Sequence, residues 1–355
     1  PCDLSALCRA AALVAIAGVA ATAGDTAAVC VTRVDFAKAR QRIDPAAMRS
    51  SNLIVKPHGH TSKLVDETCG LSTLIGQNAA VQSLQTLVVG PFRRLLQEGP
   101  LGIINAPVGV LLTGEAGTGK THLAVQLAVD LKAHIHAAAP ADLLASRVGD
   151  AEKSVAALFS AARRSAPTVV VLEDIDSIAP ANSSDLAGVD CQLGEDNLGI
   201  DPESETRAAY VLRSEIDTLH LRRMAHARMC SDGRKFPLAS EALVLIVATA
   251  RNASLVAPWL LRPHRLSCCI HLEPEFCVSD VRQLMQYILQ NSGQTLSESI
   301  LADVSDAICS VGKGRPAIVA AICRAAAVKA IRRAVGFGSR PCIEKDDLLT
   351  ALGTC

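Results

Sequence analysis

Residues 109–121 read GVLLTGEAGTGKT, and this stretch decides the fold. The part from Gly114 to Thr121 matches the pattern G-x-x-x-x-G-K-[ST] in full. The apolar run 108–112 predicts a strand before the motif, and residues 120–131 predict a helix after it. A strand, a glycine-rich turn and a helix in this order are the context that the motif requires.

This context predicts a phosphate-binding loop. Glycines let successive backbone N–H groups turn inward around phosphate oxygens, and the start of the helix adds the positive end of its dipole. Lys120 is expected to reach the β- and γ-phosphates of a nucleotide, and Thr121 to bind magnesium.

Acidic residues follow a second apolar strand further along the chain. The run 168–172 ends directly before Glu173 and Asp174, and Asp176 follows. Because the carboxyl ends of parallel strands meet at one edge of a sheet, the carboxylates of Glu173 and Asp174 are expected beside the phosphate loop. One acid would orient magnesium and its waters, and the other would polarise an attacking water. A pair of helix-capping acids is the alternative.

Strand-like and helix-like segments alternate through the middle of the chain. Helices are expected at 151–164 and 206–219, a further strand at 243–248, and only helices from Ser279 onward. This alternation predicts an α/β fold in which helices sandwich a parallel sheet, followed by a small all-α region.

Two segments are expected to be surface insertions. Residues 181–206 are rich in Ser, Asn, Gly and acidic side chains, whereas residues 220–240 carry a cluster of Arg and Lys. The basic segment is interpreted either as a solvated loop or as a contact for RNA or an acidic partner.

The composition excludes several classes of protein. Lys and Arg total 35, as do Asp and Glu, so the net charge argues against a protein that coats nucleic acid or an anionic membrane. Aromatic residues are only 3% of the chain, which argues against binding by base stacking. The apolar stretch 10–23 is too short to span a bilayer.

The cysteines and the first residue add two expectations. The 13 cysteines show no C-x-x-C spacing, which indicates reduced thiols in an intracellular protein. The chain begins with Pro1 rather than Met, so we expect it to be a fragment or a processed product.

An Ala-rich motif occurs near both ends of the chain. Residues 8–12 and 323–327 both read CRAAA, and segments 31–39 and 343–351 match in the same order. Two matches in order predict a helical module that occurs twice, with chance similarity of Ala-rich helices as the alternative.

Together these motifs resemble the AAA ATPases. The resemblance covers residues 70–355 and rests on the segments 109–121, 141–153, 166–180, 248–252 and 260–266. It implies a tandem, Cdc48-like protein. Residues 1–43 would be the helical lid of a preceding AAA module, 44–69 an inter-module linker, 70–276 the large α/β nucleotide-binding domain and 277–355 the helical lid.

Within the tandem group, the chain is most similar to the spermatogenesis-associated ribosome-maturation AAA ATPases. Segments 42–50 and 55–57 and the long insertion before 243–248 carry this similarity, while 260–266 is shared with the peroxisomal AAA ATPases. The resemblance implies ATP and Mg²⁺ as cofactors, and homo- or hetero-hexameric rings acting on protein or ribonucleoprotein substrates. It implies no membrane span and no sequence-specific binding of nucleic acid. The expected location is the cytoplasm, with the nucleus or a peroxisome-associated site as alternatives.

The resemblance also assigns site residues. Glu173 and Asp174 would be catalytic, with Arg262 and Arg265 serving the nucleotide of the neighbouring subunit. Thr121 and Glu173 would bind the metal. The nucleotide would be bound by Gly114, Glu115, Ala116, Gly117, Thr118, Gly119, Lys120, Thr121, His122, Ile75 and Gly76.

Several departures from the family pattern touch hydrolysis and pulling. The acidic pair is Glu then Asp instead of Asp then Glu, so the carboxylate expected to polarise water is one methylene shorter. Ala250 stands where the family has a sensor Asn, with Asn252 two residues further on. Arg147 replaces the aromatic residue of the substrate-gripping loop, and Arg315-Pro316 replaces a Gly-Ala pair of the lid.

The resemblance and these departures leave three functions open. The first is an ATP-driven remodelling machine, active in ribosome maturation, whose hydrolysis is weakened at this module. One alternative is a nucleotide-binding structural subunit of a hetero-hexamer that lends its arginines to neighbours, and the other is a peroxisomal-biogenesis-type AAA ATPase.

Overall fold

The structure is a computed structural model, and it describes residues 2–20, 31–36, 70–71, 74–98, 106–143, 150–181, 207–231, 243–294, 296–337 and 342–354. The chain divides into two compact units, Pro1–Val55 and Lys56–Cys355. Arg147, the linker 44–69 and residues 182–206 of the acidic segment lie outside the described residues.

The first unit contains helix α1 (Cys2–Ala20) and a short helix at 33–36. The carboxylate of Asp35 accepts hydrogen bonds from the backbone N–H and the hydroxyl of Thr32, at 2.9 and 2.7 Å. The carboxylate of Asp35 therefore satisfies the backbone N–H of Thr32 at the start of the short helix.

The second unit is built on a parallel sheet of five strands. The strands are β1 (Gly109–Thr113), β2 (His134–Ala138), β3 (Thr168–Leu172), β4 (Val244–Ala250) and β5 (Cys268–His271). Their order in the sheet is β2-β3-β4-β1-β5, and every pairing is parallel. Strands β1, β3 and β4 are buried throughout, as expected for a sheet covered on both faces. The predicted α/β sandwich is confirmed.

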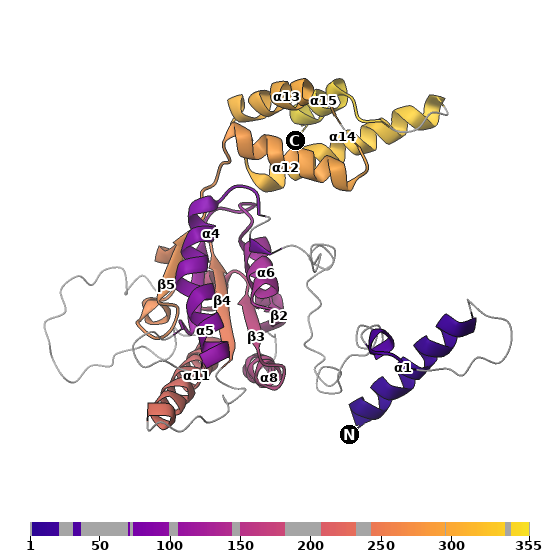
Figure 1. Ribbon diagram of the computed structural model, residues 1–355. Coiled ribbons are helices and arrows are strands. Elements are labelled where there is room, and N and C mark those ends of the chain that lie inside the picture. The colour runs from indigo at the N-terminus through magenta and orange to yellow at the C-terminus, as the bar shows by residue number, and fades with distance from the viewer. Residues whose placement is uncertain are drawn as a thin grey trace, which may run out of the picture. The chain divides into compact units, whose positions relative to one another are not determined.

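Helices cover both faces of this sheet (Figure 1). They are α4 (Asn78–Leu84), the π-helical turn η2 (Gln85–Val89), α5 (Gly90–Glu98), α6 (Lys120–Asp130), α7 (Pro140–Leu143), α8 (Asp150–Arg164), α9 (Ile175–Ile178) and α11 (Arg207–Ser231).

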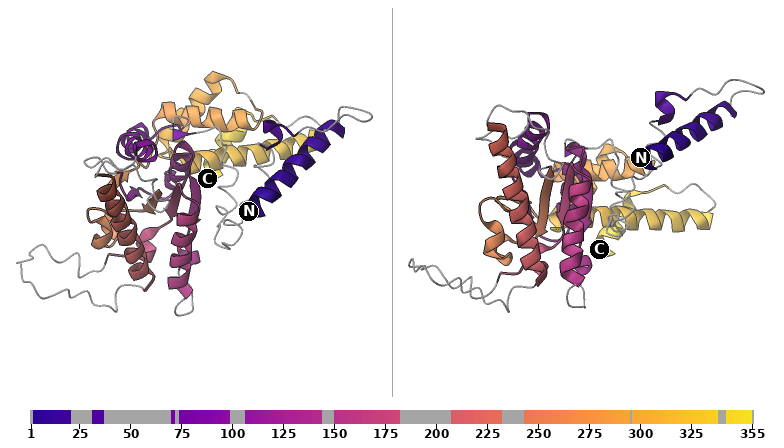
Figure 2. Two further views of the ribbon diagram at one scale, coloured as in Figure 1. Left: turned by 60° about the horizontal axis from the view of Figure 1, so that its bottom comes forward. Right: turned by 90° about the horizontal axis from the view of Figure 1, so that it is seen from below.

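Alternate strand residues feed two separate hydrophobic clusters. Val169 and Val171 of β3 pack with Leu123 of α6 on one face, whereas Val170 packs with Leu158 of α8 on the other. Helices α8 and α11 contact each other on that second face (Figure 2).

The final part of the chain is all-helical. It comprises α12 (Val278–Asn291), α13 (Glu298–Ser310), α14 (Pro316–Phe337) and α15 (Lys345–Thr354), which share one hydrophobic cluster. Short 3-10 helices η4 (Ala253–Leu255) and η5 (Pro258–Leu261) lie between β4 and β5. Among the described helices, none is long and apolar enough to cross a membrane.

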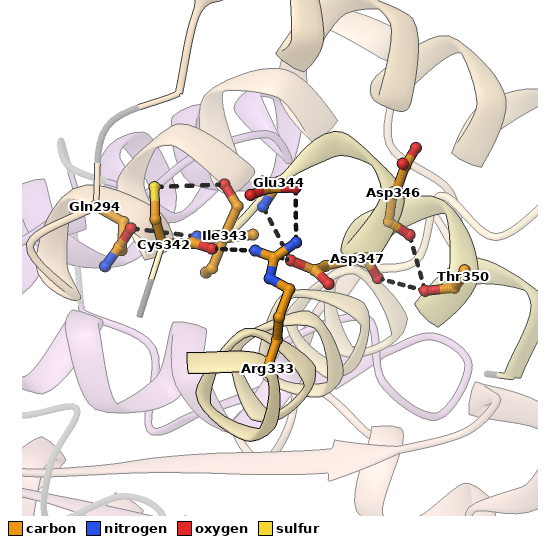
Figure 3. A network of polar contacts seen from close by, with 8 residues as sticks. All are labelled: Gln294, Arg333, Cys342, Ile343, Glu344, Asp346, Asp347 and Thr350. Carbon is orange, nitrogen blue, oxygen red and sulfur yellow. Dashed lines mark hydrogen bonds and ion pairs between the residues drawn. The ribbon is translucent and has the colours of Figure 1, made fainter. Parts of the chain in front are cut away.

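A polar network fixes the start of α15 against α14. Figure 3 shows Arg333 between Glu344 and Asp347, with N–O distances of 2.6 and 3.0 Å. The N–H of Glu344 donates to the carboxylate of Asp347 at 3.1 Å. Thr32 and Asp35 make the same bond and hold the matching places in the sequence repeat, so the two similar segments also share a capping geometry.

The prediction of a surface insertion at 220–240 is wrong for its first part. Helix α11 continues to Ser231, so Arg223 lies on a helix rather than in a loop. Its guanidinium donates to the carbonyls of Ala106, Pro107 and Val244, and burial lowers its pKa to about 10. This arginine ties α11 to the segment before β1 and to the start of β4.

Replacing Arg223 with Met should lower the free energy of unfolding by about 3 kcal/mol, because three carbonyls lose a charged donor. The matched control is Arg207→Met, at the exposed start of the same helix, which should leave stability nearly unchanged. Denaturant titration of the full chain measures both changes. Equal unfolding midpoints for the two variants would contradict a stabilising role for the Arg223 hydrogen bonds.

The stability of the fold should fall as the pH drops below the ordinary histidine pKa of 6.5. Burial lowers the pKa values of His122, His136 and His220 below that value in the folded chain. Above pH 6.5 these histidines are neutral in both the folded and the unfolded chain, so they do not oppose folding. Below pH 6.5 the unfolded chain binds protons more readily than the folded chain, and the free energy of unfolding therefore falls.

Melting temperatures between about pH 7.5 and about pH 5.5 measure this dependence. Replacing the three histidines with Gln should flatten the slope. A chain that becomes more stable on acidification, or a triple variant with an unchanged slope, would show that these residues are not its source.

Candidate active site

The glycine-rich loop follows β1 and opens α6, and its backbone already has the conformation of a cradle. Gly117 and Gly119 have φ values of 83° and 95°, in the left-handed region that favours glycine. The hydroxyl of Thr118 donates to the carbonyl of Glu115 at 2.9 Å, which fixes the turn from within. The loop from Gly114 to Thr121 is therefore shaped to present backbone N–H groups to an anion.

Lys120 lies inside this loop. Its ammonium group donates to the carbonyls of Gly114 and Glu115, at 2.7 and 2.8 Å. Burial holds the pKa of Lys120 below its ordinary value, and the nearby carboxylates of Asp174 and Asp176 offset part of this lowering. The cation expected to contact phosphate thus lies close to the acids that follow β3.

The acids are positioned by the ends of β3 and β4. The N–H of Asp174 donates to the hydroxyl of Thr249 at 3.1 Å, and Asp174 has a φ of 43°. The N–H of Glu173 instead donates to the carbonyl of Ala138 at 3.0 Å. The two neighbouring acids are therefore held by different strands, and Asp174 is one of the two carboxylates that act on Lys120.

Asp176 is a further acid near the loop, and no motif in the sequence assigns it a role of its own. Its Oδ1 is buried, and among the described residues it has no hydrogen-bond partner. A buried carboxylate oxygen without a partner, near a phosphate-loop lysine, fits a site that receives a cation or its bound water. The only signal in the sequence was its place on the first turn after the acidic pair.

The end of β4 does not supply the missing sensor amide. Ala250 is fully buried, and the side chain of Asn252 accepts a hydrogen bond from Ser254 N–H at 3.3 Å, capping η4. The backbone carbonyl of Arg251 accepts a hydrogen bond from Gly114 N–H at 3.1 Å. The positive charge of the Arg251 side chain contributes to the lowered pKa of Lys120. Arg251 is therefore a second cation near the loop, and the sequence reasoning missed it.

The helical region contacts the loop through the start of α14. Arg315 forms an ion pair with Glu115, and Ala317 N–H donates to the carbonyl of Gly117 at 3.2 Å. A Cβ atom on Gly117 would lie only 2.9 Å from the Cβ of Ala317. The Arg315-Pro316 departure thus falls directly beside the phosphate loop.

Ile75 and Gly76 lie at the entrance to α4, against the segment that leads into the helical region. Gly76 has a φ of 71°, and a Cβ there would meet the ring of Phe276 at 2.8 Å. Gln77 exchanges two hydrogen bonds with the backbone of Glu273, at 2.6 and 3.1 Å. His122 lies on the first turn of α6, and its Nε2 atom is 3.3 Å from the Nε2 atom of Gln126.

The two candidate arginines are placed differently. Arg262 is exposed, whereas Arg265 is buried and forms an ion pair with Asp217 of α11. No pattern in the sequence distinguishes these two arginines.

The donor set fits a magnesium nucleotide. Magnesium is usually held by one or two protein ligands together with phosphate oxygens, and no described group of three His, Cys, Asp or Glu residues could hold a metal ion by itself. Thr121 and the acids after β3 are the residues that would hold the ion, and the loop N–H groups with Lys120 would hold the phosphates.

Comparison with known proteins agrees with this geometry. Residues 110–274 match the model of the "ATPase family associated with various cellular activities (AAA)". The chain is 29% identical over 275 residues to the human "ATPase family gene 2 protein homolog B", which covers 77% of this chain and 33% of that protein.

Two further relatives are informative. The "Cell division cycle protein 48 homolog" of Archaeoglobus fulgidus is 28% identical over 314 residues, covering 87% of this chain and 35% of the relative. The "Ribosome biogenesis ATPase RIX7" of Saccharomyces cerevisiae is 26% identical over 255 residues, covering 70% of this chain and 26% of the relative. The chain therefore spans about a third or less of the length of the relatives it matches. The resemblance to Cdc48-like AAA proteins is supported.

Proposed function

Because residues 110–274 match the AAA family model, we propose that this chain binds ATP with Mg²⁺ at the loop 114–121 and contributes to its hydrolysis. The observation that carries the proposal is the position of Lys120. It lies within a preformed glycine-rich loop and close to the carboxylates of Asp174 and Asp176. A cation within a glycine-rich loop, near acids that follow a neighbouring strand, fits phosphoryl transfer.

Each residue of the site has a proposed role. The loop N–H groups and Lys120 hold the phosphates, and Thr121 and Glu173 hold the metal. Bound Mg²⁺ supplies charge neutralisation between the phosphates. Asp174 accepts the proton of the attacking water, and Thr249 fixes the backbone from which this carboxylate extends. Ile75, Gly76 and His122 complete the nucleotide-binding set.

Hydrolysis at this module is proposed to be weak. Asp174 is one methylene shorter than the family's glutamate, and Asn252 is occupied in capping η4 rather than replacing the sensor amide. Arg251, which follows Ala250 in the chain, adds a positive charge near the loop but no neutral amide. The water is therefore less well held than in a site with both groups.

The proposed assembly is a hexameric ring that remodels proteins or ribonucleoproteins. One relative is named as a ribosome biogenesis ATPase, which supports ribosome maturation as the process. Residues 1–43 are proposed to be the lid of a preceding module, because Asp35 repeats the capping bond of Asp347. The compartment stays a prediction.

A second function is a nucleotide-binding subunit that hydrolyses little itself. The buried Ala250 and the occupied Asn252 favour it. The steady-state ATPase rate of the full chain distinguishes the two functions: a rate that disappears in Lys120→Ala supports the enzyme, and ATP binding without such a rate supports the structural subunit.

Lys120→Ala should abolish ATP binding, because a compact cation opposite two phosphates is lost. Isothermal titration calorimetry with ATP and Mg²⁺ measures this directly. The control is Lys153→Ala, an exposed lysine of α8 whose side chain is 82% exposed, which should bind as wild type does. Unchanged affinity in Lys120→Ala would contradict the loop assignment.

Asp174→Asn should lower kcat by about 10²-fold or more, since the acceptor for the water's proton is gone. Asp174→Glu should preserve or raise kcat, because the longer carboxylate reaches further. Asp306→Asn, at an exposed acid of α13, serves as the control. Wild-type turnover in Asp174→Asn would remove this residue from the water-positioning role.

A further inference from the structure

The two candidate arginines are the ends of one tight turn. Arg265 N–H donates to the carbonyl of Arg262 at 3.2 Å, and His264 has a φ of 74°. Proline at the second position and a positive φ at the third are the features of a type II turn, in which the third residue is usually glycine. A side chain in that conformation adds strain, so contacts from outside the turn are needed to hold it.

Arg265 supplies the main outside contact. Its Nε and one terminal nitrogen lie 2.6 and 2.7 Å from the two carboxylate oxygens of Asp217, and the other terminal nitrogen lies 2.6 Å from the carbonyl of Trp259. The guanidinium also lies 5.6 Å from the centre of the Trp259 ring. A paired, two-point contact of this kind is among the stronger polar interactions of proteins.

A second contact comes from the next turn of the same helix. The rings of His220 and His264 are stacked, with their centres 4.4 Å apart and their planes 24° apart. Helix α11 thus holds the turn at two points, Asp217 and His220.

Arg262 differs from Arg265 in its exposure and in its side-chain contacts. It is exposed, and within the described part of the chain no hydrogen bond or ion pair of its side chain is recorded. We infer that Asp217 is a positioning residue: it keeps Arg265 within its own subunit as the anchor of the turn, and so leaves Arg262 as the arginine presented to a neighbour's nucleotide. The inference rests on the proposed role of this turn between subunits.

Two hypotheses predict different effects of Asp217→Ala on kcat. In the anchor hypothesis Arg265 stays bound to Asp217, and in the alternative Arg265 itself reaches the neighbour's phosphate. Under the anchor, Asp217→Ala and Arg265→Ala lower the kcat of assembled rings by a similar factor at unchanged KM, and the double variant is no worse than either. Under the alternative, Asp217→Ala releases Arg265, so the kcat of Asp217→Ala stays at the wild-type value or rises. The kcat of Arg265→Ala then falls as far as that of Arg262→Ala. That pattern would overturn the inference.

A matched control removes a different ion pair of α11. Glu215→Ala breaks the contact with Arg163, 2.5 Å between nitrogen and oxygen, at an acid whose side chain is more buried than that of Asp217. It should lower the melting temperature without lowering kcat. A fall in kcat as large as that of Asp217→Ala would mean that any loosening of α11 suffices, and would also overturn the inference.

Subunit mixing separates a misplaced arginine from a damaged subunit. Asp217→Ala subunits keep their own phosphate loop, so Lys120→Ala subunits placed beside them, with an intact turn, should restore activity. No recovery, in rings shown by mass measurement to be mixed, contradicts a positioning role.

The proposed function and the anchor can fail separately. Unchanged kcat in Arg262→Ala would overturn the role of the turn between subunits. The anchor is then decided by a double-mutant cycle on the melting temperature, with Asp217→Ala and Arg265→Ala, in rings saturated with a non-hydrolysable ATP analogue. Coupling that persists in these rings supports the anchor, and coupling present in isolated subunits but lost in rings overturns it.

Discussion

The parallel pairing of β3 with β4 and of β4 with β1 is the constraint on which the rest of the structure depends. Parallel strands end at the same edge, so the phosphate loop, the acids and the residues after β4 meet there although they are far apart in sequence. The contacts between Gly114 and Arg251, and between Asp174 and Thr249, are direct products of this pairing.

The same constraint explains why the family departures matter. Ala250 ends β4 beside β1, and Asn252, two residues further on, uses its side chain to cap η4. Asp176 and Arg251 add charge of opposite sign around Lys120. Under the proposed function, the site keeps the residues assigned to the phosphates and changes those assigned to the attacking water.

The sequence predicted the parts of the fold that carry a strong period. Strands β1, β3 and β4 are continuous apolar runs, and the motif at 114–121 fixed the loop between β1 and α6. Strand β5 was missed because only Ile270 among its four residues is buried, so no apolar run marks it. The extension of α11 was missed because its basic residues resemble a solvated loop, whereas Arg223 binds three carbonyls of other segments. The difference between Arg262 and Arg265 depends on Asp217, which no local pattern connects to them.

The most direct test of the account is an experimental structure of the full chain with Mg²⁺ and a non-hydrolysable ATP analogue. The account predicts that the phosphates lie against the backbone N–H groups of residues 117–121, and that the ammonium of Lys120 leaves the carbonyls of Gly114 and Glu115 to contact them. It also predicts that Asp174 faces the terminal phosphate. A nucleotide bound elsewhere, or a Lys120 that keeps its contacts within the loop while the nucleotide is bound, would contradict the account.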